Sequence, residues 1–300
     1  MRIGVIGTGV AGTLLTEGLL AASAISVAAF ERARLGTQAE AGTGLNIGPN
    51  ALRALRLHRP ARHAALRAAS LPWRRWTIAL ADGTQLLDLD VAELAGEPGA
   101  RLRWSEIYRV LRAPVAAATR SGLALAALEE DTAGRLIPVF SAPDNRLVRV
   151  GAFDLLVGAD GRYSRTRALA AGEPTPEFMG TCLWRLLVPS AVNCPFDDYG
   201  QWFNGSNRLL AFRLPRDAVY VAGAFPLGPG GKLPTEVRTP AAQRALFRSA
   251  NAPPCAAVAW MLDWMERQLN DLHWARTQSI PLPRRALPAQ IDAARRQPGP

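Results

Sequence analysis

Cysteine and histidine are scarce in this chain of 300 residues. It contains three of each, namely Cys182, Cys194, Cys255, His58, His63 and His273. The odd cysteine count and the lack of a C-x-x-C pair argue against a disulfide scaffold and a cysteine-bound zinc site. Three histidines are too few for a metal centre built from imidazoles. We therefore expect no metal site, and the sequence singles out no catalytic nucleophile.

Lysine is almost missing, because Lys232 stands alone beside 34 arginines. Such an imbalance is more typical of a codon preference for arginine than of a surface selected to bind a polyanion. The formal net charge is +10, and residues 53–75 contain seven arginines and no acidic residue. A nucleic-acid-binding protein is thus one alternative, but this run is better explained as the face of a solvated helix, and we expect no nucleic-acid partner.

A long uninterrupted apolar segment is also lacking. Residues 3–30 carry one charge, Glu17, and residues 21–24 could pass for a cleavage site, so a signal peptide or a membrane anchor is an alternative. Glycines at positions 4, 7, 9, 12 and 18 interrupt the segment. Its pattern is short strand, glycine turn, helix and short strand, which a membrane helix would not show. We therefore expect a cytoplasmic protein without a membrane anchor; the oligomeric state stays open.

The same segment predicts a β-α-β unit, with strands over residues 3–6 and 25–30 and a helix over 11–22. Two strands joined in this way lie parallel with a right-handed crossover. Further helices are expected over residues 50–71 and 106–118. Later strands are expected at 76–80 and 85–89 as a hairpin, at 123–128, 135–140 and 146–150 as a meander, and at 154–157. From Pro174 on, aromatic strand-like runs predict an antiparallel layer, and the fold class is α/β.

The turn between the first strand and the first helix carries the pattern G-x-G-x-x-G, as Gly7-Thr8-Gly9-Val10-Ala11-Gly12. Its position after a strand and at the start of a helix is the context in which this pattern is informative. Gly7 allows a tight turn, Gly9 lets the backbone approach a pyrophosphate, and Gly12 lets the helix pack on the strand. The helix N-terminus then offers free N–H groups to the phosphates.

Glu31 closes the second strand, 24 residues after Gly7. A carboxylate there can accept hydrogen bonds from both ribose hydroxyls of an adenosine, and it would repel a 2′-phosphate. The site therefore favours FAD or NAD over NADP. The alternative is an ordinary glycine turn with an unrelated surface acid.

Four stretches make the chain resemble the class A FAD-dependent flavoprotein monooxygenases, the para-hydroxybenzoate-hydroxylase-like enzymes. The most specific is Asp154-Leu155-Leu156-Val157-Gly158-Ala159-Asp160-Gly161, continuing to Arg167, which is similar to the Asp-Gly motif of that family. The other three are Gly7–Gly12 with Glu31, Gly44-Leu45-Asn46-Ile47-Gly48-Pro49-Asn50-Ala51-Leu52, and Trp184-Arg185-Leu186-Leu187-Val188-Pro189. Together these four stretches, which occur in the same order as in the family, extend the resemblance over residues 1 to about 280.

The resemblance implies a Rossmann-like FAD-binding domain with a three-layer ββα arrangement, and a mainly antiparallel β-sheet substrate layer. It implies FAD as cofactor, NADH or NADPH as electron donor, and hydroxylation of an aromatic or similar electron-rich small molecule with O2. The implied cofactor-binding residues are Gly7, Gly9, Val10, Ala11, Gly12, Glu31, Arg32, Asn46, Arg103, Asp160 and Gly161. Substrate contacts are expected from Trp184, Arg185, Trp202 and Phe212, for which the alternative is a core role.

The domain limits expected from the resemblance are discontinuous. Residues 1–72 and 100–176, with 265–280 returning, form the FAD-binding domain, and residues 73–99 and 177–264 form the substrate domain. Residues 281–300 are expected to be an irregular tail.

Two departures from the family weaken the expected site. The arginine that opens the helix near Glu106 in the family is Trp104 here, so Arg103 would have to substitute, with Arg109 as a weaker candidate. The chain also has no Gly-Asp dipeptide, the third family motif, and the ending reads as truncated. Losing that motif would weaken FAD binding about a hundredfold or more. The alternative function is therefore a non-catalytic remnant that binds FAD or another dinucleotide.

Overall fold

The computed structural model describes residues 1–34, 43–248 and 252–281. The chain divides into two compact units, one built from Met1–Glu40 and Ile107–Glu177 and the other from Ala41–Glu106 and Phe178–Ser279. The domain limits expected above place residues 41–72 and 100–106 with the cofactor, and these limits remain predictions. Except for Pro281, the expected tail lies outside the described residues.

The first unit contains a four-stranded sheet in the order β12-β1-β2-β8. Its members are β1 (Arg2–Ile6), β2 (Ser26–Glu31), β8 (Thr119–Ser121) and β12 (Leu155–Gly158). All three pairings are parallel, as the β-α-β pattern predicts. The predicted crossover helix is α1 (Val10–Leu20), which buries its small residues Gly12, Thr13 and Thr16.

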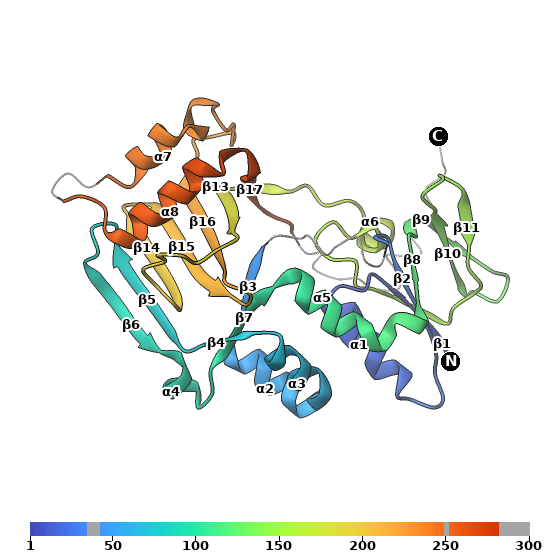
Figure 1. Cartoon of the computed structure of the whole chain (residues 1–300). Coiled ribbons are helices and arrows are strands. Elements are labelled where there is room, and N and C mark those ends of the chain that lie inside the picture. Colours follow the sequence, from blue (N-terminus) through green and yellow to red (C-terminus); the bar gives the residue numbers. More distant parts are fainter. Residues whose placement is uncertain (35–42, 249–251, 282–300) are drawn as a thin grey trace. The chain divides into compact units, whose positions relative to one another are not determined.

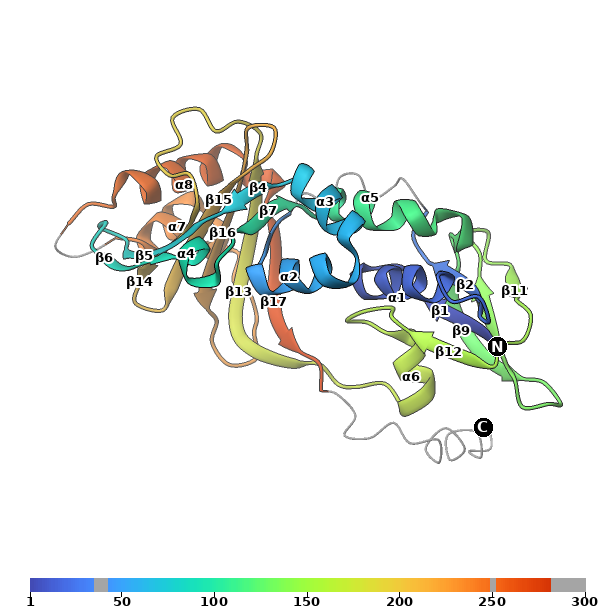
Figure 2. The ribbon, with the colours of Figure 1, turned by 90° about the horizontal axis from the view of Figure 1, so that it is seen from below.

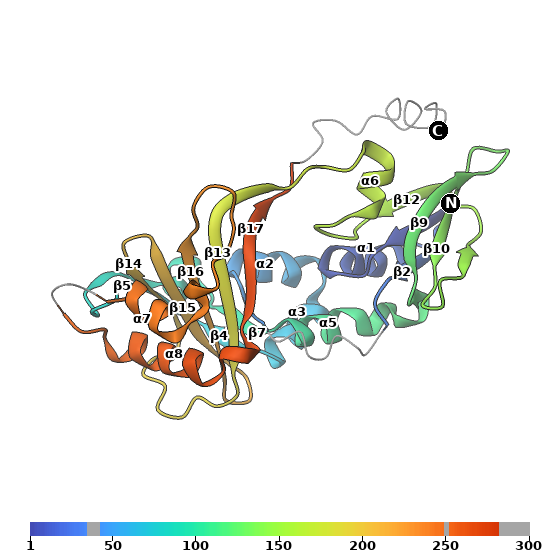
Figure 3. The ribbon, with the colours of Figure 1, turned by 90° about the horizontal axis from the view of Figure 1, so that it is seen from above.

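Two further layers flank this sheet. On one side α1 contacts β1 and β2. On the other side lies the predicted meander, the antiparallel sheet of β9 (Ala124–Glu130), β10 (Leu136–Ser141) and β11 (Leu147–Arg149) (Figure 3). Phe30 of β2 stacks on Phe140 of β10 with ring centroids 4.6 Å apart, and Phe153 meets Phe30 edge-on at 5.9 Å. The expected three-layer ββα arrangement is therefore confirmed.

The second unit is organised around a seven-stranded sheet in the order β17-β13-β16-β15-β14-β5-β6. The strands are β5 (Arg75–Leu80), β6 (Gln85–Asp90), β13 (Glu177–Val188), β14 (Tyr199–Asn204), β15 (Asn207–Leu214), β16 (Ala218–Pro226) and β17 (His273–Ser279). β17 runs alongside β13 (Figures 2 and 3). The β14–β5 pair is parallel, and the β5–β6, β13–β16, β14–β15 and β15–β16 pairs are antiparallel. The expected, mainly antiparallel second sheet is confirmed.

The two faces of this sheet have different coverings. The helices α7 (Pro240–Leu246) and α8 (Ala256–Arg267) pack on one face, where they share a core with every second residue of β13 (Figure 1). The 3-10 turns η2 (Glu236–Arg238) and η3 (Leu269–Asp271) flank these helices. A smaller cluster that includes Phe212 and Tyr220 occupies the opposite face. Side chains of neighbouring strand residues therefore reach different environments.

A small sheet completes the second unit. It consists of β3 (Gly44–Ile47), β7 (Gly99–Arg103) and β4 (Leu71–Trp73), accompanied by α2 (Pro49–His58), α3 (Pro60–Ala68) and α4 (Val91–Ala95). Gly44 lets β3 lie close to the large sheet, because a Cβ there would be 2.8 Å from both Phe212 Cε2 and Tyr220 Cβ.

Two helix predictions need correction. The single helix expected over residues 50–71 is two helices, because Arg59 precedes Pro60 and adopts φ −148° and ψ 65° (Figure 2). The helix expected over 106–118 is α5 (Trp104–Arg112) followed by a 3-10 helix, η1 (Ala113–Ala118), which has Pro114 near its start. Among the described residues, no helix combines the length and apolar character needed to cross a membrane.

Candidate functional site

Three parallel strands of the first unit end side by side. Ile6 at the end of β1 pairs with Phe30 of β2 and with Gly158 of β12. The residues that follow these strands therefore meet at one edge of the sheet, where ligands bind in open α/β sheets. A cavity of about 440 Å³ opens at this edge, a volume within the usual range for small-molecule sites.

The cavity brings together six of the predicted cofactor-binding residues, namely Gly7, Gly9, Glu31, Arg32, Asp160 and Gly161. The remainder of its described lining is Ile6, Phe30, Tyr108, Arg112, Leu123, Ala124, Leu125, Ala159, Arg162, Tyr163 and Arg165. The cavity thus has an apolar wall of aliphatic and aromatic side chains and a polar wall rich in arginine. The predicted residues Val10, Ala11 and Gly12 belong to the adjoining first turn of α1.

The three glycines of the turn have different surroundings. Gly7 has φ +93°, and a Cβ there would be 2.6 Å from Asp160 Cα. A Cβ on Gly12 would be 1.9 Å from Gly7 O, so Gly12 allows the close packing of α1 on the turn. A Cβ on Gly9 would have no atom within 4 Å. Gly7 and Gly12 are therefore explained by the fold itself, whereas Gly9 leaves its side open to the cavity.

The N-terminus of α1 is open to a ligand. Gly9 is its N-cap residue and provides no side-chain hydrogen bond to the first turn, and Val10 and Ala11 are exposed. The first N–H groups of a helix have no partner within the helix and carry a partial positive charge. Such a terminus suits a phosphate group.

Glu31 is buried, with 7% of its surface exposed, and its carboxylate is held by the backbone. Thr8 donates to Oε2 from its N–H at 2.9 Å and from its hydroxyl at 3.1 Å, and Ala33 N–H donates to Oε1 at 3.0 Å. A carboxylate oxygen can accept more than one hydrogen bond. Glu31 is therefore oriented before a ligand binds and can still accept from ribose hydroxyls.

Arg112 is a site residue that the sequence interpretation missed. It lines the cavity, its Nε donates to Thr8 O at 2.7 Å, and its Nη2 is 3.3 Å from Glu31 Oε2. The predicted alternative on the same helix, Arg109, is exposed. The sequence offered one signal for Arg112, namely its place on the predicted helix directly after the apolar residue Leu111. The family pattern instead directs attention to position 104, eight residues earlier.

Asp160 has a role within its own loop. Its Oδ1 accepts from the Ser164 hydroxyl at 2.5 Å, and its Oδ2 accepts from the N–H and hydroxyl of Thr166 at 2.9 and 3.1 Å. Ser164 in turn caps α6 (Arg165–Ala171) by accepting from Arg167 N–H. Asp160 therefore fixes the loop at the cavity edge and is not itself the N-cap residue of α6.

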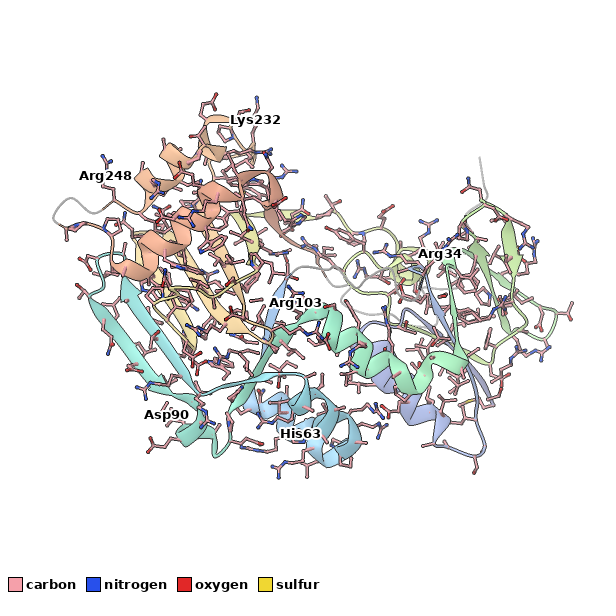
Figure 4. All side chains as sticks on the ribbon, in the orientation of Figure 1. Arg34, His63, Asp90, Arg103, Lys232 and Arg248 are labelled. Atoms are coloured by element: carbon pink, nitrogen blue, oxygen red, sulfur yellow. The ribbon has the colours of Figure 1, made fainter. Side chains whose placement is uncertain are left out.

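Asn46 and Arg103, two further predicted cofactor-binding residues, belong to the second unit. Gly44 pairs with Arg103 across β3 and β7, so Asn46 and Arg103 lie on the same face of this small sheet. Asn46 Oδ1 and Arg103 Nε are both buried without a hydrogen-bond partner (Arg103 is labelled in Figure 4). Buried polar atoms are normally hydrogen-bonded, so these two atoms mark a place where a ligand can satisfy them.

The four predicted substrate-contacting residues lie on different faces of the large sheet. Trp184 is fully buried in the core under α8 and donates from Nε1 to Gln243 Oε1 at 2.8 Å, and Trp202 belongs to the same core. Arg185 and Phe212 lie on the opposite face. Both tryptophans therefore have the core position that the sequence analysis gave as the alternative to substrate contact.

The face that carries Phe212 is rich in tyrosine. Tyr220 lies 5.1 Å from Phe212 and Tyr199 5.8 Å from it, between ring centroids. Burial raises the pKa of Tyr220 above its ordinary value, while the positive charge of Arg185 acts in the opposite direction. Burial raises the pKa of Tyr199 as well. Both phenols are therefore protonated and uncharged at neutral pH.

The first unit thus has the parts that an adenosine diphosphate moiety requires. An open helix N-terminus and an accessible glycine backbone suit the diphosphate, and an oriented carboxylate suits the ribose. These parts come from residues 7–12 and Glu31, and Asp160 and Gly161 line the same cavity although they lie far away in the sequence.

None of the available protein-family models matches this chain, but individual proteins do. It is 30% identical over 230 residues to the 3-amino-4-hydroxybenzoate 2-monooxygenase PtnB3 of Streptomyces platensis, covering 72% of this chain and 54% of the relative. It is 28% identical over 213 residues to the 6-methylsalicylate 1-monooxygenase atA of Aspergillus terreus, covering 64% and 45%. The chain spans about half the length of these relatives.

The fold is also that of flavin-binding monooxygenases. HpxO of Klebsiella pneumoniae, solved with FAD and uric acid, superposes with a TM-score of 0.74 at 18% identity, covering 93% of this chain and 68% of HpxO. The resemblance to the class A FAD-dependent monooxygenases is confirmed.

Proposed function

We propose that this chain binds FAD and acts as a monooxygenase on an aromatic or similarly electron-rich small molecule, with NADH or NADPH as electron donor and O2 as co-substrate. The observation that carries the proposal is the cavity of the first unit at which the glycine turn, Glu31 and Asp160 meet. The similar proteins support it, because they are monooxygenases named for 3-amino-4-hydroxybenzoate and 6-methylsalicylate, and HpxO was solved with FAD.

Each wall of the cavity has a defined task in binding FAD. The carboxylate of Glu31 accepts hydrogen bonds from the ribose of the adenosine, and the N-terminus of α1 faces the diphosphate. Arg112 contributes positive charge on the same side and holds Glu31 in place. Asp160 and Gly161 line the same cavity beside the glycine turn, where Gly161 adopts φ +79°.

Bound FAD would supply the redox chemistry, taking electrons from the nicotinamide donor and activating O2. The protein then has to orient the substrate and exclude water from the reacting groups. Arg185 is our candidate for orienting an anionic substrate, since it pairs with Ala222 and so lies on the face of the sheet that carries Phe212 and Tyr220. Phe212 would supply an apolar surface for the ring.

Flavin binding is the first test, because it can be measured without turnover. FAD titrated into the purified chain should give a saturable quench of flavin fluorescence and a bound-flavin absorption spectrum. The Glu31→Ala variant should bind about tenfold or more weakly, because it loses hydrogen bonds to a charged group. A wild-type chain that takes up no FAD, or a variant that binds as well as wild type, would contradict the assignment of this cavity.

Turnover is a separate test. The FAD-loaded chain should oxidise NADH or NADPH faster in the presence of substituted hydroxybenzoates, and product analysis should show one added oxygen atom. FAD binding without any oxygen insertion would support instead the alternative of a dinucleotide-binding module without activity.

A further inference from the structure

The second unit contains another cavity, which the proposed function does not use. It measures about 370 Å³ and is lined by Gly231, Lys232, Leu233, Arg238, Trp274, Ala275 and Arg276. These residues come from the loop after β16, from η2 and from β17. We call the four side chains of Lys232, Arg238, Arg276 and Trp274 the basic tryptophan cluster.

Positive charge dominates this cluster. Lys232, the single lysine of the chain, lies on the loop that leads to η2 and is exposed (Figure 4). Arg238 and Arg276 are exposed as well, and none of the described residues that line the cavity is acidic. Three cations around one small cavity make it suited to a multiply charged anion.

Trp274 contributes an aromatic ring to the lining of the cavity. Its ring is half-buried against Phe225, with ring centroids 6.3 Å apart, and Arg238 Cζ lies 5.8 Å from the ring centroid. Arg276 follows two positions later on β17, so it lies on the same face of the strand. A planar ring of a ligand can therefore stack near the guanidinium groups while its anionic group meets them.

The loop over the cavity is held in position. Arg276 Nη1 donates to Gly231 O at 3.3 Å, and Gly231, at φ +64°, lies so close to Phe178 that a Cβ would be 3.0 Å from its ring. By contrast, a Cβ on Gly228 or Gly230 would have no atom within 4 Å. The backbone of this glycine-rich loop is thus accessible beside Lys232.

A second tryptophan–arginine pair in the same unit provides a comparison. Arg267 Cζ lies 5.5 Å from the ring centroid of Trp264 on α8. That helix carries the acidic residues Asp263 and Glu266, which pair with Arg244. The pair on α8 therefore lies among mixed charges, whereas the charged residues that line the cavity at Trp274 are all cations.

We propose that the basic tryptophan cluster binds the phosphate-bearing end of a purine nucleotide, with the phosphate on the three cations and the base near Trp274. A phosphate with more than one negative charge matches three cations better than a singly charged carboxylate does. The G-x-G-x-x-G pattern occurs once in the chain, so a second nucleotide needs another type of site. The identification of that nucleotide as NADPH, the donor with the additional phosphate, rests on the proposed function. The inference that the cluster binds a nucleotide does not depend on the proposed function.

Binding of NADP+ to the FAD-treated full chain, measured by isothermal titration calorimetry, tests the site. The double variant Lys232→Glu/Arg238→Glu should bind NADP+ about tenfold or more weakly, because it loses charge-assisted hydrogen bonds. Trp274→Leu should weaken binding to a lesser extent. Arg267→Glu, which reverses one charge beside a tryptophan of the same unit, should bind like the wild type.

Three results would overturn the inference. These are no binding of NADP+ to the wild type, an unchanged Kd in the double variant, and a loss of affinity in Arg267→Glu equal to that of the double variant. Benzoate serves as the comparison ligand, and a cluster that binds benzoate but not NADP+ would be a carboxylate site.

The affinity for FAD, measured on the same samples, separates this inference from the proposed function, because variants in the cluster should leave the affinity for FAD unchanged. If the chain binds NADP+ through the cluster but no FAD, the nucleotide site stands and the proposed function fails.

Discussion

Arg112 and Glu31 form an ion pair at the wall of the cavity, with Nη2 3.3 Å from Oε2, although they are 81 positions apart in the chain. The side chains are 11% and 9% exposed, so the pair is largely withdrawn from water. The same guanidinium donates to Thr8 O from Nε. One side chain therefore joins the glycine turn to the acidic end of β2, and it fixes the distance between the groups that would face the diphosphate and the ribose.

This relationship predicts that Arg112→Met weakens both the fold and FAD binding. The substitution leaves the Glu31 carboxylate without its counter-charge, which costs about 3 kcal/mol in a buried pair. Urea denaturation would measure the free energy of unfolding, and flavin fluorescence would measure the Kd for FAD. The double variant Glu31→Gln/Arg112→Met should lose less stability than the sum of the single variants, because the two residues share one interaction.

Arg109→Met is the matched control, since Arg109 lies on the same helix and is exposed. It should leave the Kd for FAD within about twofold of wild type, as expected for a surface substitution. Additive effects in the Glu31 and Arg112 series, or an effect of Arg109 as large as that of Arg112, would show that the ion pair does not organise the site.

The two glycines of the turn predict opposite outcomes for the same substitution. Gly12→Ala would place a Cβ 1.9 Å from Gly7 O, so the free energy of unfolding should fall by about 1–3 kcal/mol or more. Gly9→Ala meets no atom within 4 Å, so the stability should change by no more than about 1 kcal/mol, the effect of an N-cap change. Its Cβ would enter the space over the helix N-terminus, and FAD affinity should therefore fall. A Gly9→Ala variant with wild-type FAD affinity would mean that no ligand approaches the backbone there.

The difference between these glycines also shows what local sequence can predict. Gly7, Gly12 and Glu31 were identified because the spacing of a β-α-β unit is set by short-range geometry. Arg112 was not, because its position depends on how α5 packs beside the glycine turn, a contact across more than 100 residues. A family pattern that expected an arginine at position 104 directed attention to Arg103 and Arg109 instead.

The same distinction applies to the second unit. The hairpin of β5 and β6 was predicted from its turn residues, and the two sheets from their strand patterns. The alternation along β13 shows that Trp184 and Arg185 lie on opposite faces, but it does not say which face α8 covers. Pro60 in the sequence indicates a helix break at Arg59. We nevertheless predicted one continuous helix, because the surrounding residues favour helix formation.

Trp184 provides a test of core packing against substrate contact. Trp184→Phe would remove the donor to Gln243 Oε1 and leave an unfilled space beside Gly223, so stability should fall by about 2–4 kcal/mol. Thermal or urea unfolding would measure this loss, and the Kd for FAD should stay unchanged. Trp264→Phe, at a half-buried position on α8, should cost less. A Trp184→Phe variant of normal stability with a raised KM for the aromatic substrate would instead support the substrate contact predicted from the sequence.

Alkaline pH should destabilise the second unit through its buried tyrosines. Burial raises the pKa of Tyr220 above the unfolded value of about 10, so its protonated form contributes fully to stability below that pH, and this contribution is lost as the pH rises through the folded pKa. The free energy of unfolding should therefore fall as the pH rises above about 10, and it should fall less in Tyr220→Phe, which cannot ionise. Tyr163→Phe is the control, because Tyr163 is 64% exposed and a substitution at the surface changes the stability little. Parallel profiles for Tyr220→Phe and the wild type would show that ionisation of this phenol is not linked to unfolding.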